Sequence, residues 1–150
     1  MQIKGDYTVS GPRERVWQYF TDAEWLQQCI PGCEELKSLG DDTFEATIKV
    51  GVAAIKGTYK GSVKLEDRQP PAAYRLVLHG ESKIGFVNGS GNFRLEETEE
   101  NQTTVSLSGE LMVGGKLARV GQRMIGGAAK MMIGKFFKGV EKLAQSDAVT

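Results

Sequence analysis

The sequence predicts an α+β fold in which a curved antiparallel sheet faces a long C-terminal helix. Three observations lead to this fold class. From Glu35 to Val113, apolar and polar residues alternate with a period of two, as in strands that are wet on one side. From Gly115 to about Gln145, apolar residues recur with the spacing of an α-helix. One strand and two short helices precede the alternating region.

The N-terminal strand is expected at "IKGDYTVS". Pro12 follows it, at a position where the first turn of a helix tolerates a missing N–H. Thr21 and Glu24 have the spacing of a capping box, which predicts a second helix from Asp22 to about Cys29. The pair Pro31–Gly32 ends that helix and suits the centre of a type II turn.

The strands of the sheet are separated by turn signals at "GDD", "VGVA", "RQPPA", "KIG" and "EENQ". One face of these strands is apolar or lacks a side chain altogether. It is expected to consist of Phe44, Ala46, Ile48, Val50, Ile55, Gly57, Tyr59, Gly61, Val63, Leu65, Val87, Gly89, Gly91, Phe93, Leu95, Val105, Leu107, Gly109, Leu111 and Val113. His79 alternates with Leu76 and Leu78, so it is expected on the wet face.

The C-terminal helix is expected to bury an apolar stripe although it contains several glycines, each of which costs about 1 kcal/mol relative to alanine. The stripe is predicted to run through Leu117, Val120, Met124, Ala128, Met131 and Met132, and then through Phe136, Phe137, Val140 and Leu143.

Glycines also occupy core positions of the predicted sheet, opposite the glycine-bearing helix. Protein interiors pack to a density of about 0.75, so the missing side chains leave volume that something must occupy. One interpretation is that these glycines only let the sheet curve, with Met and Phe side chains of the helix filling the gap. The interpretation we favour is a ligand cavity between sheet and helix.

The walls of this cavity would be almost wholly apolar, which suits a lipid-like or polyprenyl-like ligand. Tyr59 is the one inward residue with a hydroxyl group, a candidate hydrogen bond to the head group of a ligand. The candidate ligand-binding residues are Phe44, Ile48, Ile55, Tyr59, Gly61, Val63, Val87, Gly89, Gly91, Phe93, Leu107, Gly109, Leu111, Met124, Met131 and Met132.

Charge is unevenly distributed along the chain although the net charge is zero. Residues 116–142 carry seven Lys and Arg residues against one Glu, so a basic helix lies on an acidic body. Overall neutrality argues against nucleic-acid binding. The basic helix predicts contact with an anionic membrane or an acidic partner, with simple solvation as the alternative. The candidate contact residues are Arg123, Lys130, Lys135 and Lys138.

Catalytic chemistry has little support in the sequence. His79 is the only histidine, and no nucleophile is paired with a base. Cys29 and Cys33 lack the spacing of a redox pair and, with one histidine, cannot supply the four ligands of a structural zinc site. We therefore expect reduced cysteines, no metal, no cofactor and no enzymatic activity.

The length and composition of the chain are those of one globular domain, with 40% hydrophobic and 25% charged residues. We expect this domain to cover residues 1–145 and residues 146–150 to form a flexible tail. No apolar run reaches the roughly 20 residues of a membrane span, and the N-terminus lacks the apolar region of a signal peptide. A cytoplasmic location is expected, with the inner face of the membrane as a candidate peripheral contact.

Four stretches together resemble the family of the G subunit of carbon monoxide dehydrogenase. They are "VW" followed by "CIPGCEEL", then "VGVAAIKGTYKGSV", "GFVNGSGNFRL" and "VGGKLARVGQRMIGGAAKMMIGKFF". The resemblance extends from about Ile3 to Leu143. It implies the START-like (SRPBCC) helix-grip fold, a seven-stranded curved antiparallel sheet wrapped around a long C-terminal helix, with two short helices after the first strand.

The resemblance also implies a function. Members of this family are accessories to a molybdenum-containing CO dehydrogenase or a related hydroxylase, proposed to recruit the enzyme to the membrane or to handle a lipophilic, quinone-type ligand. Some relatives carry a C-terminal membrane-anchoring segment, whereas this chain stops at "AQSDAVT", so a peripheral contact is expected. Two alternatives stay open: an assembly or docking factor that binds no ligand, and an enzyme of the cyclase or aromatase kind.

Overall fold

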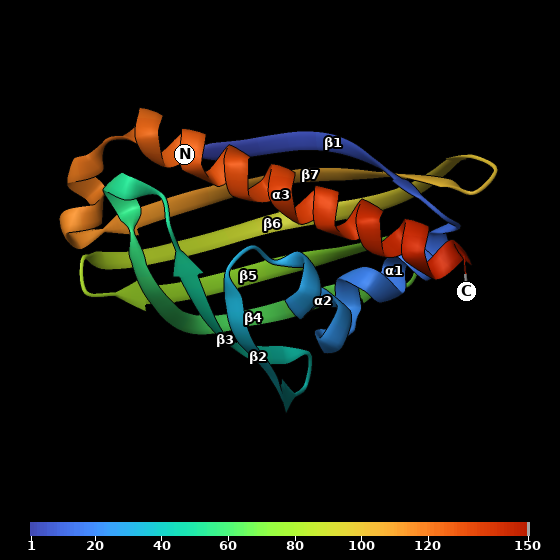
Figure 1. Cartoon of the computed structure of the whole chain (residues 1–150), viewed down its shortest axis with the longest axis horizontal. Helices are drawn as coiled ribbons and strands as arrows, with labels where there is room; N and C mark the ends of the chain where they lie inside the picture. Colours follow the sequence, from blue (N-terminus) through green and yellow to red (C-terminus); the bar gives the residue numbers. More distant parts are fainter. Residues whose placement is uncertain (150) are drawn as a thin grey trace.

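Seven antiparallel strands form one curved sheet in the computed structural model, which describes residues 1–149 and the side chains of residues 1–147. The strand order is β1-β7-β6-β5-β4-β3-β2, so β1 closes one edge beside the last strand (Figure 1). The strands are β1 Gln2–Ser10, β2 Cys33–Gly40, β3 Thr43–Val50, β4 Gly57–Gln69, β5 Ala73–Ser82, β6 Gly85–Glu99 and β7 Gln102–Gly114. This is the architecture that the sequence predicts.

The helices lie on the concave face of the sheet (Figure 1). They are α1 Arg13–Thr21, α2 Ala23–Cys29 and the long α3 Gln122–Val149, and two short 3₁₀ segments are η1 Ala53–Ile55 and η2 Gly115–Val120. α3 packs against β1 along one flank and against α2 on the other. The predicted arrangement of two short helices after the first strand and one long helix after the last is confirmed.

The caps of α1 and α2 differ in detail from the prediction. Pro12 is the N-cap of α1 and thus lies one position before the first helical residue. The capping box is wrong, because the Asp22 side chain accepts the Glu24 N–H at 3.0 Å and so caps α2. Thr21 instead donates its hydroxyl proton to the Trp17 carbonyl oxygen at 2.9 Å.

The turn after α2 has the predicted form. The Cys33 N–H donates to the Ile30 carbonyl oxygen at 3.2 Å, and Gly32 has a φ of 72°, as the third residue of a type II turn requires. A Cβ atom at Gly32 would collide with the Lys49 carbonyl oxygen. Only glycine therefore fits at this position.

The C-terminal helical region is not one continuous helix. It begins as the 3₁₀ segment η2, and Gly121, with a φ of 98°, separates η2 from α3. This break rotates the buried stripe, so that Ile125 faces inward beside Ala128, which was predicted to be inward. Met124 and Met131, which the prediction placed inward, are 55% and 42% exposed.

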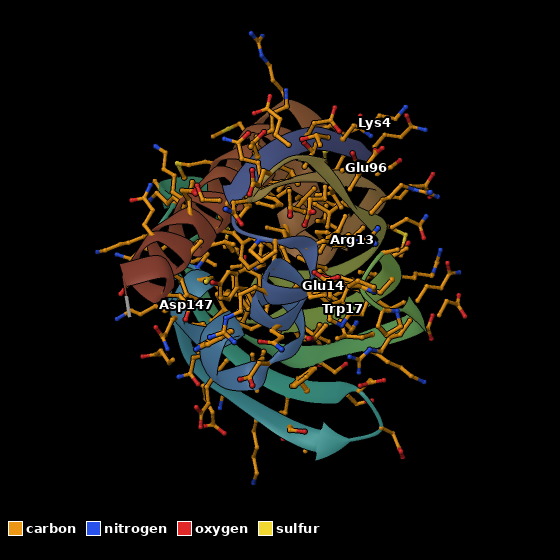
Figure 2. All side chains as sticks on the ribbon, turned by 90° about the vertical axis from the view of Figure 1, so that its right-hand side faces the viewer. Lys4, Arg13, Glu14, Trp17, Glu96 and Asp147 are labelled. Carbon is orange, nitrogen blue, oxygen red and sulfur yellow. The ribbon has the colours of Figure 1, made fainter. Side chains whose placement is uncertain are left out.

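The end of α3 extends beyond the predicted boundary. Residues 146–149 are helical, where the sequence suggested a flexible tail. Asp147 explains the extension, because its carboxylate accepts hydrogen bonds from the Arg15 guanidinium at 2.6 and 2.7 Å and from the Tyr19 hydroxyl at 2.6 Å. Figure 2 views this end of the molecule, with Asp147 on α3. Residue 150 lies outside the described residues.

An aromatic core fills the space between the sheet, α1 and the C-terminal half of α3. Phe20 and Phe137 are 1% and 5% exposed, and the ring of Phe137 stacks on Tyr7 with centroids 3.9 Å apart. Phe93 stacks on Tyr74 at 5.0 Å. The solid packing at this end of the molecule contrasts with the other end, where the N-terminal half of α3 covers the sheet.

Candidate functional site

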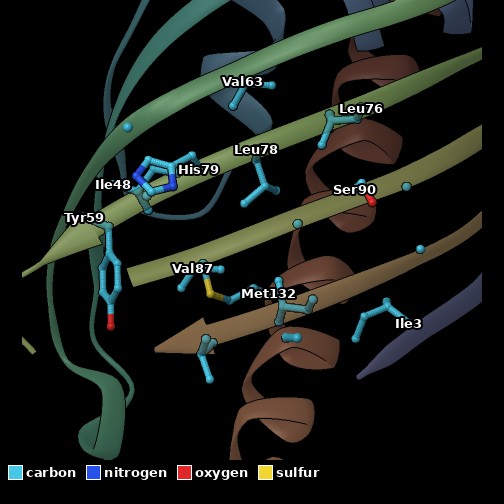
Figure 3. Close-up of a pocket in the computed structure, with 18 of the residues that line it drawn as sticks. Ile3, Ile48, Tyr59, Val63, Leu76, Leu78, His79, Val87, Ser90 and Met132 are labelled. Carbon is cyan, nitrogen blue, oxygen red and sulfur yellow. The ribbon is translucent and has the colours of Figure 1, made fainter. Parts of the chain in front are cut away.

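A cavity of about 350 Å³ lies between the sheet and the N-terminal half of α3 (Figure 3). Every strand except β2 contributes to its wall, and η1 and η2 complete it. The apolar side chains that line it belong to Ile3, Ala46, Ile48, Val50, Ile55, Tyr59, Val63, Leu76, Leu78, Val87, Phe93, Leu107, Leu111, Val113, Leu117, Ile125, Ala128, Ala129, Met132 and Ile133.

The structure gathers most of the candidate ligand-binding residues around this one cavity. Those that line it are Ile48, Ile55, Tyr59, Gly61, Val63, Val87, Gly89, Gly91, Phe93, Leu107, Gly109, Leu111 and Met132. Three do not. Phe44 is buried in the aromatic core, and the side chains of Met124 and Met131 are exposed on the outer face of α3. The methionine placements were wrong because they assumed a helix without the break at Gly121.

Sequence reasoning also missed part of the lining. Leu76 and Leu78 carried a usable signal, since they alternate with outward-facing His79 in β5. Ile125 and Ile133 were hidden by the same break at Gly121, which sets the phase of α3. Ile3 lies on β1, opposite Gly109 of β7, and only the pairing of these two strands brings it into the site.

The floor of the cavity contains glycines of two kinds. At Gly61 and Gly109 a Cβ atom would collide with a main-chain oxygen of the neighbouring strand, so these glycines let strands approach closely. At Gly89 and Gly91 the nearest atoms to an added Cβ would be leucine side-chain carbons, at 3.2 and 3.1 Å. The curvature interpretation therefore holds for the first pair, whereas the second pair makes room for leucine side chains that pack over the floor.

Polar residues along the wall contribute main chain to it. Lys60, Ser62, His79, Ser90 and Glu110 are each the chain neighbour of a glycine on the floor, and side chains alternate in direction along a strand. Their side chains thus belong to the outer face. The inner surface that a ligand would meet is hydrocarbon and bare peptide.

Tyr59 lies at one end of the cavity, as Figure 3 shows. Its hydroxyl donates a hydrogen bond to the carbonyl oxygen of Ile55 in η1, at 2.7 Å. Burial raises the pKa of Tyr59, so the hydroxyl keeps its proton at neutral pH. That proton is engaged within the protein, which leaves the hydroxyl less suited to the predicted bond with a head group.

The side chain of His79 lies on the wet face, as predicted, although the main chain of this residue is part of the cavity wall. Its Nδ1 is 2.5 Å from the Asn88 side-chain oxygen, and its Nε2 is 3.6 Å from a carboxylate oxygen of Glu81. The side chain is 44% exposed. These contacts join exposed side chains of β5 and β6 and place the imidazole away from the ligand space.

Both cysteines are free thiols. Cys29 is buried, and burial raises its pKa to about 11. Burial also raises the pKa of Cys33, whose sulfur lies 3.3 Å from the carbonyl oxygen of Glu35. A protonated thiol is a weak nucleophile and a poor metal ligand. Among the described residues, no three His, Cys, Asp or Glu side chains gather in a way that could hold a metal ion.

The outer face of α3 combines positive charge with exposed methionine. All four candidate contact residues are exposed, and within the described part of the chain no ion pair involves any of them. They are Arg123, Lys130, Lys135 and Lys138. Met124 and Met131 lie on the same face. Within residues 1–149, none of the helices has the length and apolar character needed to cross a membrane.

Solved structures with similar folds come from several bacteria. A conserved protein from Geobacillus kaustophilus is 36% identical, with a TM-score of 0.94 over 97% of this chain and 96% of that one. A START superfamily protein from Mycobacterium smegmatis is 10% identical, with a TM-score of 0.74 over 97% of each chain. The Zhui aromatase/cyclase from Streptomyces sp. R1128 is 16% identical, with a TM-score of 0.72 over 97% of this chain and 93% of that one.

The last two likenesses establish the fold alone, which is the START-like helix-grip fold. No match was found among curated proteins. The family of the carbon monoxide dehydrogenase G subunit (CoxG) matches residues 5–145, nearly the whole chain. This match confirms the resemblance noted in the sequence. The protein belongs to the CoxG family.

Proposed function

We propose that the protein binds a lipophilic, quinone-like or lipid-like ligand without transforming it, as an accessory to a molybdenum-containing CO dehydrogenase or a related hydroxylase. The observation that carries this proposal is the apolar cavity beneath α3. Its volume of about 350 Å³ falls in the usual range for small-molecule sites. An unfilled interior forgoes packing contacts, and a bound apolar molecule would restore them.

The chemistry of the wall favours binding over catalysis. A cyclase-like enzyme would need an acid or base aimed at its substrate. Here the hydroxyl of Tyr59 donates to Ile55, and the imidazole of His79 lies on the outer face. An apolar wall instead stabilises a ligand by burying its hydrocarbon surface, at about 25 cal/mol per Å².

The partner in this proposal comes from the family description, which names a component of carbon monoxide dehydrogenase. The alternative is a docking factor for the same enzyme that binds no ligand. Co-purification of the dehydrogenase with tagged protein tests the association itself. Repeating the co-purification with protein stripped of lipophilic molecules distinguishes a ligand-binding accessory from a docking factor. A pure docking factor needs no ligand to bind its partner.

Peripheral docking on an anionic membrane is the second part of the proposal. The exposed cations of α3 would be attracted to anionic head groups at about 1 kcal/mol each. Met124 and Met131, exposed among these cations, could enter the apolar boundary of the bilayer. Such docking would bring the cavity beneath α3 close to a source of lipophilic molecules.

Ligand uptake tests the function directly. Native mass spectrometry of gently purified protein should reveal a co-purifying lipophilic species, and delipidated protein should take up quinones or fatty acids. Ala129→Phe, on the cavity side of α3, should reduce uptake at least tenfold, because the new ring occupies the ligand space. Lys130→Phe, an exposed neighbour, is the matched control and should bind normally. Protein that arrives empty and takes up no lipophilic compound would refute the proposal.

A further inference from the structure

Three connecting segments gather at one end of the molecule, beside the N-terminus of α3 (Figure 1). They are residues 51–56, which include η1, residues 82–85 between β5 and β6, and residues 114–124, which include η2 and the start of α3. The Leu117 N–H donates to the Ile84 carbonyl oxygen at 2.7 Å, and η1 contacts η2. The three segments therefore form one continuous surface, which we call the tip.

The tip carries positive charge only. Its five cations are all exposed, and its three segments contain no Asp or Glu residue. Within the described residues, none of these cations forms an ion pair. A cluster of about four to eight Lys and Arg residues is typical of surfaces that bind anionic lipids. The tip cations are Lys56, Lys83, Lys116, Arg119 and Arg123.

The other end of the sheet is acidic. Because neighbouring strands are antiparallel, the turns after β2, β4 and β6 lie at the strand ends remote from the tip (Figure 1). These turns, residues 40–43, 67–72 and 96–101, contain two, one and four carboxylates, respectively, and a single cation, Arg68. Charge is thus separated between the two ends of the sheet. Such a separation orients the molecule with its tip toward an anionic surface.

The 3₁₀ segment η2 sorts its side chains by polarity. With three residues per turn, Lys116 and Arg119 project on one side and Leu117 on another. Leu117 is 1% exposed and lines the cavity, whereas both cations are exposed. In η1, Ile55 likewise lines the cavity, next to exposed Lys56. The tip cations therefore lie on the outer side of segments that form part of the cavity wall.

Apolar side chains are exposed among the tip cations. Met124 is 55% exposed, and Ala53 and Ala118 are exposed as well. Val52 and Ile84 are partly exposed. In the head-group region of a bilayer, cations meet anionic lipids while apolar side chains reach the boundary of the acyl chains. A lipid surface accommodates both sets at once, so we favour it over an acidic protein surface.

We infer that the tip docks on an anionic lipid bilayer. This inference rests on the proposed membrane docking and extends its contact surface from α3 over the tip. Contact through the outer face of α3 alone would lay that helix on the bilayer, whereas contact through the tip tilts the molecule and lifts its acidic turns away from the anionic lipids. In this orientation η1 and η2, which form part of the cavity wall, are the segments nearest the lipids.

Charge reversal at the tip tests the contact. Lys56→Glu, Lys116→Glu and Arg119→Glu together should weaken binding to vesicles of phosphatidylglycerol and phosphatidylcholine on the order of 100-fold or more, because each cation contributes about fivefold. If this variant has a lowered melting temperature, glutamine at the same three positions replaces it and should still weaken binding more than about tenfold. The matched control has the same change of net charge on β1, β2 and β4, and consists of Lys4→Glu, Lys37→Glu and Lys60→Glu. Equal weakening in the two triple variants would overturn the inference.

The orientation on the bilayer is measured with a fluorescent label on a single introduced cysteine. Ala118→Cys places the label on η2, and Asn101→Cys places it in the acidic turn after β6. Cys33→Ser provides the background, because Cys29 is buried. A lipid with a spin-labelled head group should quench the label at position 118 strongly and the label at position 101 hardly at all. Bound protein with an unquenched label at position 118 would refute docking through the tip.

The proposed function and this inference fail in different ways. If the wild-type protein does not bind anionic vesicles, the proposed membrane docking falls and the inference falls with it, whereas ligand uptake is measured separately. If vesicles bind but neither the charge reversal nor the label singles out the tip, docking through α3 stands and only the inference is lost. Tip reversal that leaves vesicle binding unchanged but abolishes co-purification of the dehydrogenase would assign the tip to an acidic protein surface and overturn the inference.

Discussion

The hydroxyl of Tyr59 donates a hydrogen bond to the main-chain oxygen of Ile55, 2.7 Å away, at one end of the cavity. The bond links β4 to η1, the short segment that connects β3 with β4. Tyr59→Phe should lower the free energy of unfolding by about 1 kcal/mol, the usual loss for one partly buried hydrogen bond. Ligand affinity should change less than twofold, because the ring remains. A tenfold loss in a binding titration would show that the hydroxyl turns to the ligand instead.

The two kinds of floor glycine should respond differently to alanine. Gly61→Ala should lower the free energy of unfolding by about 2 to 3 kcal/mol, because its Cβ would collide with the main chain of His79. Gly89→Ala should cost less than about 1 kcal/mol, because only the side chains of Leu78 and Leu111 must shift. Urea denaturation of both variants measures the difference. Equal losses would mean that the sheet adjusts at Gly61 as easily as a side chain does.

Gly127 and Gly134 of α3 have open space where a Cβ atom would be. Alanine at either position should stabilise the protein by about 0.5 to 1 kcal/mol, because it restricts the unfolded chain and favours the helix. If their flexibility serves ligand exchange, the double variant should also release a bound fluorescent fatty acid several-fold more slowly in stopped-flow experiments. A more stable variant with unchanged release would assign these glycines no part in exchange.

The Asp147 carboxylate should contribute to stability in acid. Hydrogen bonds from Arg15 and then Tyr19 lower its pKa from 3.8 to about 2. Since the folded state holds the proton more weakly than the unfolded state, the contribution is complete above about pH 5 and is lost as the pH falls toward 2. Asp147→Asn should therefore be less stable at pH 7 and lose less stability between pH 5 and 2. Chemical denaturation at a series of pH values checks this, with Asp6→Asn, an exposed carboxylate of β1, as control.

Reversing three cations of α3 tests the membrane contact. Lys130→Glu, Lys135→Glu and Lys138→Glu together should weaken binding to anionic vesicles by on the order of 100-fold or more, at about 1 kcal/mol for each lost cation. A vesicle sedimentation assay measures the change. The control is Lys4→Glu with Lys60→Glu, which reverses two exposed charges on β1 and β4, and it should have a small effect on vesicle binding. If both variants bound vesicles equally weakly, the α3 lysines would act only through the net charge of the protein and would not form a specific contact.

The sheet could be predicted from the sequence because its signals are local. Alternation with a period of two assigns each side chain to a face, and the turn residues mark where strands end. This is why Gly61 and Gly91 could be assigned to the inner face from the sequence alone. Whether a given glycine leaves space or admits a neighbouring strand could not be told, because that depends on main-chain atoms of another strand, such as those of His79.

The helix was harder to predict because its phase depends on one residue. Gly121 adopts a φ of 98°, and this turn decides that Ile125 rather than Met124 faces the cavity. The spacing of apolar residues in the sequence does not indicate that the main chain changes conformation at Gly121. Contacts between distant segments were equally invisible, as with Asp147, which extends α3 by accepting hydrogen bonds from Arg15.

The aromatic core and the cavity occupy opposite halves of the same interior, and this separation has an evolutionary consequence. The half around Phe20 and Phe137 holds most of the large, fully buried side chains of the protein. The wall residues around Gly89 and Gly91 are then freed to vary with whatever molecule a descendant must accept. A fold divided in this way can come to bind new ligands through substitutions in the cavity half, while selection for stable folding acts on the aromatic core.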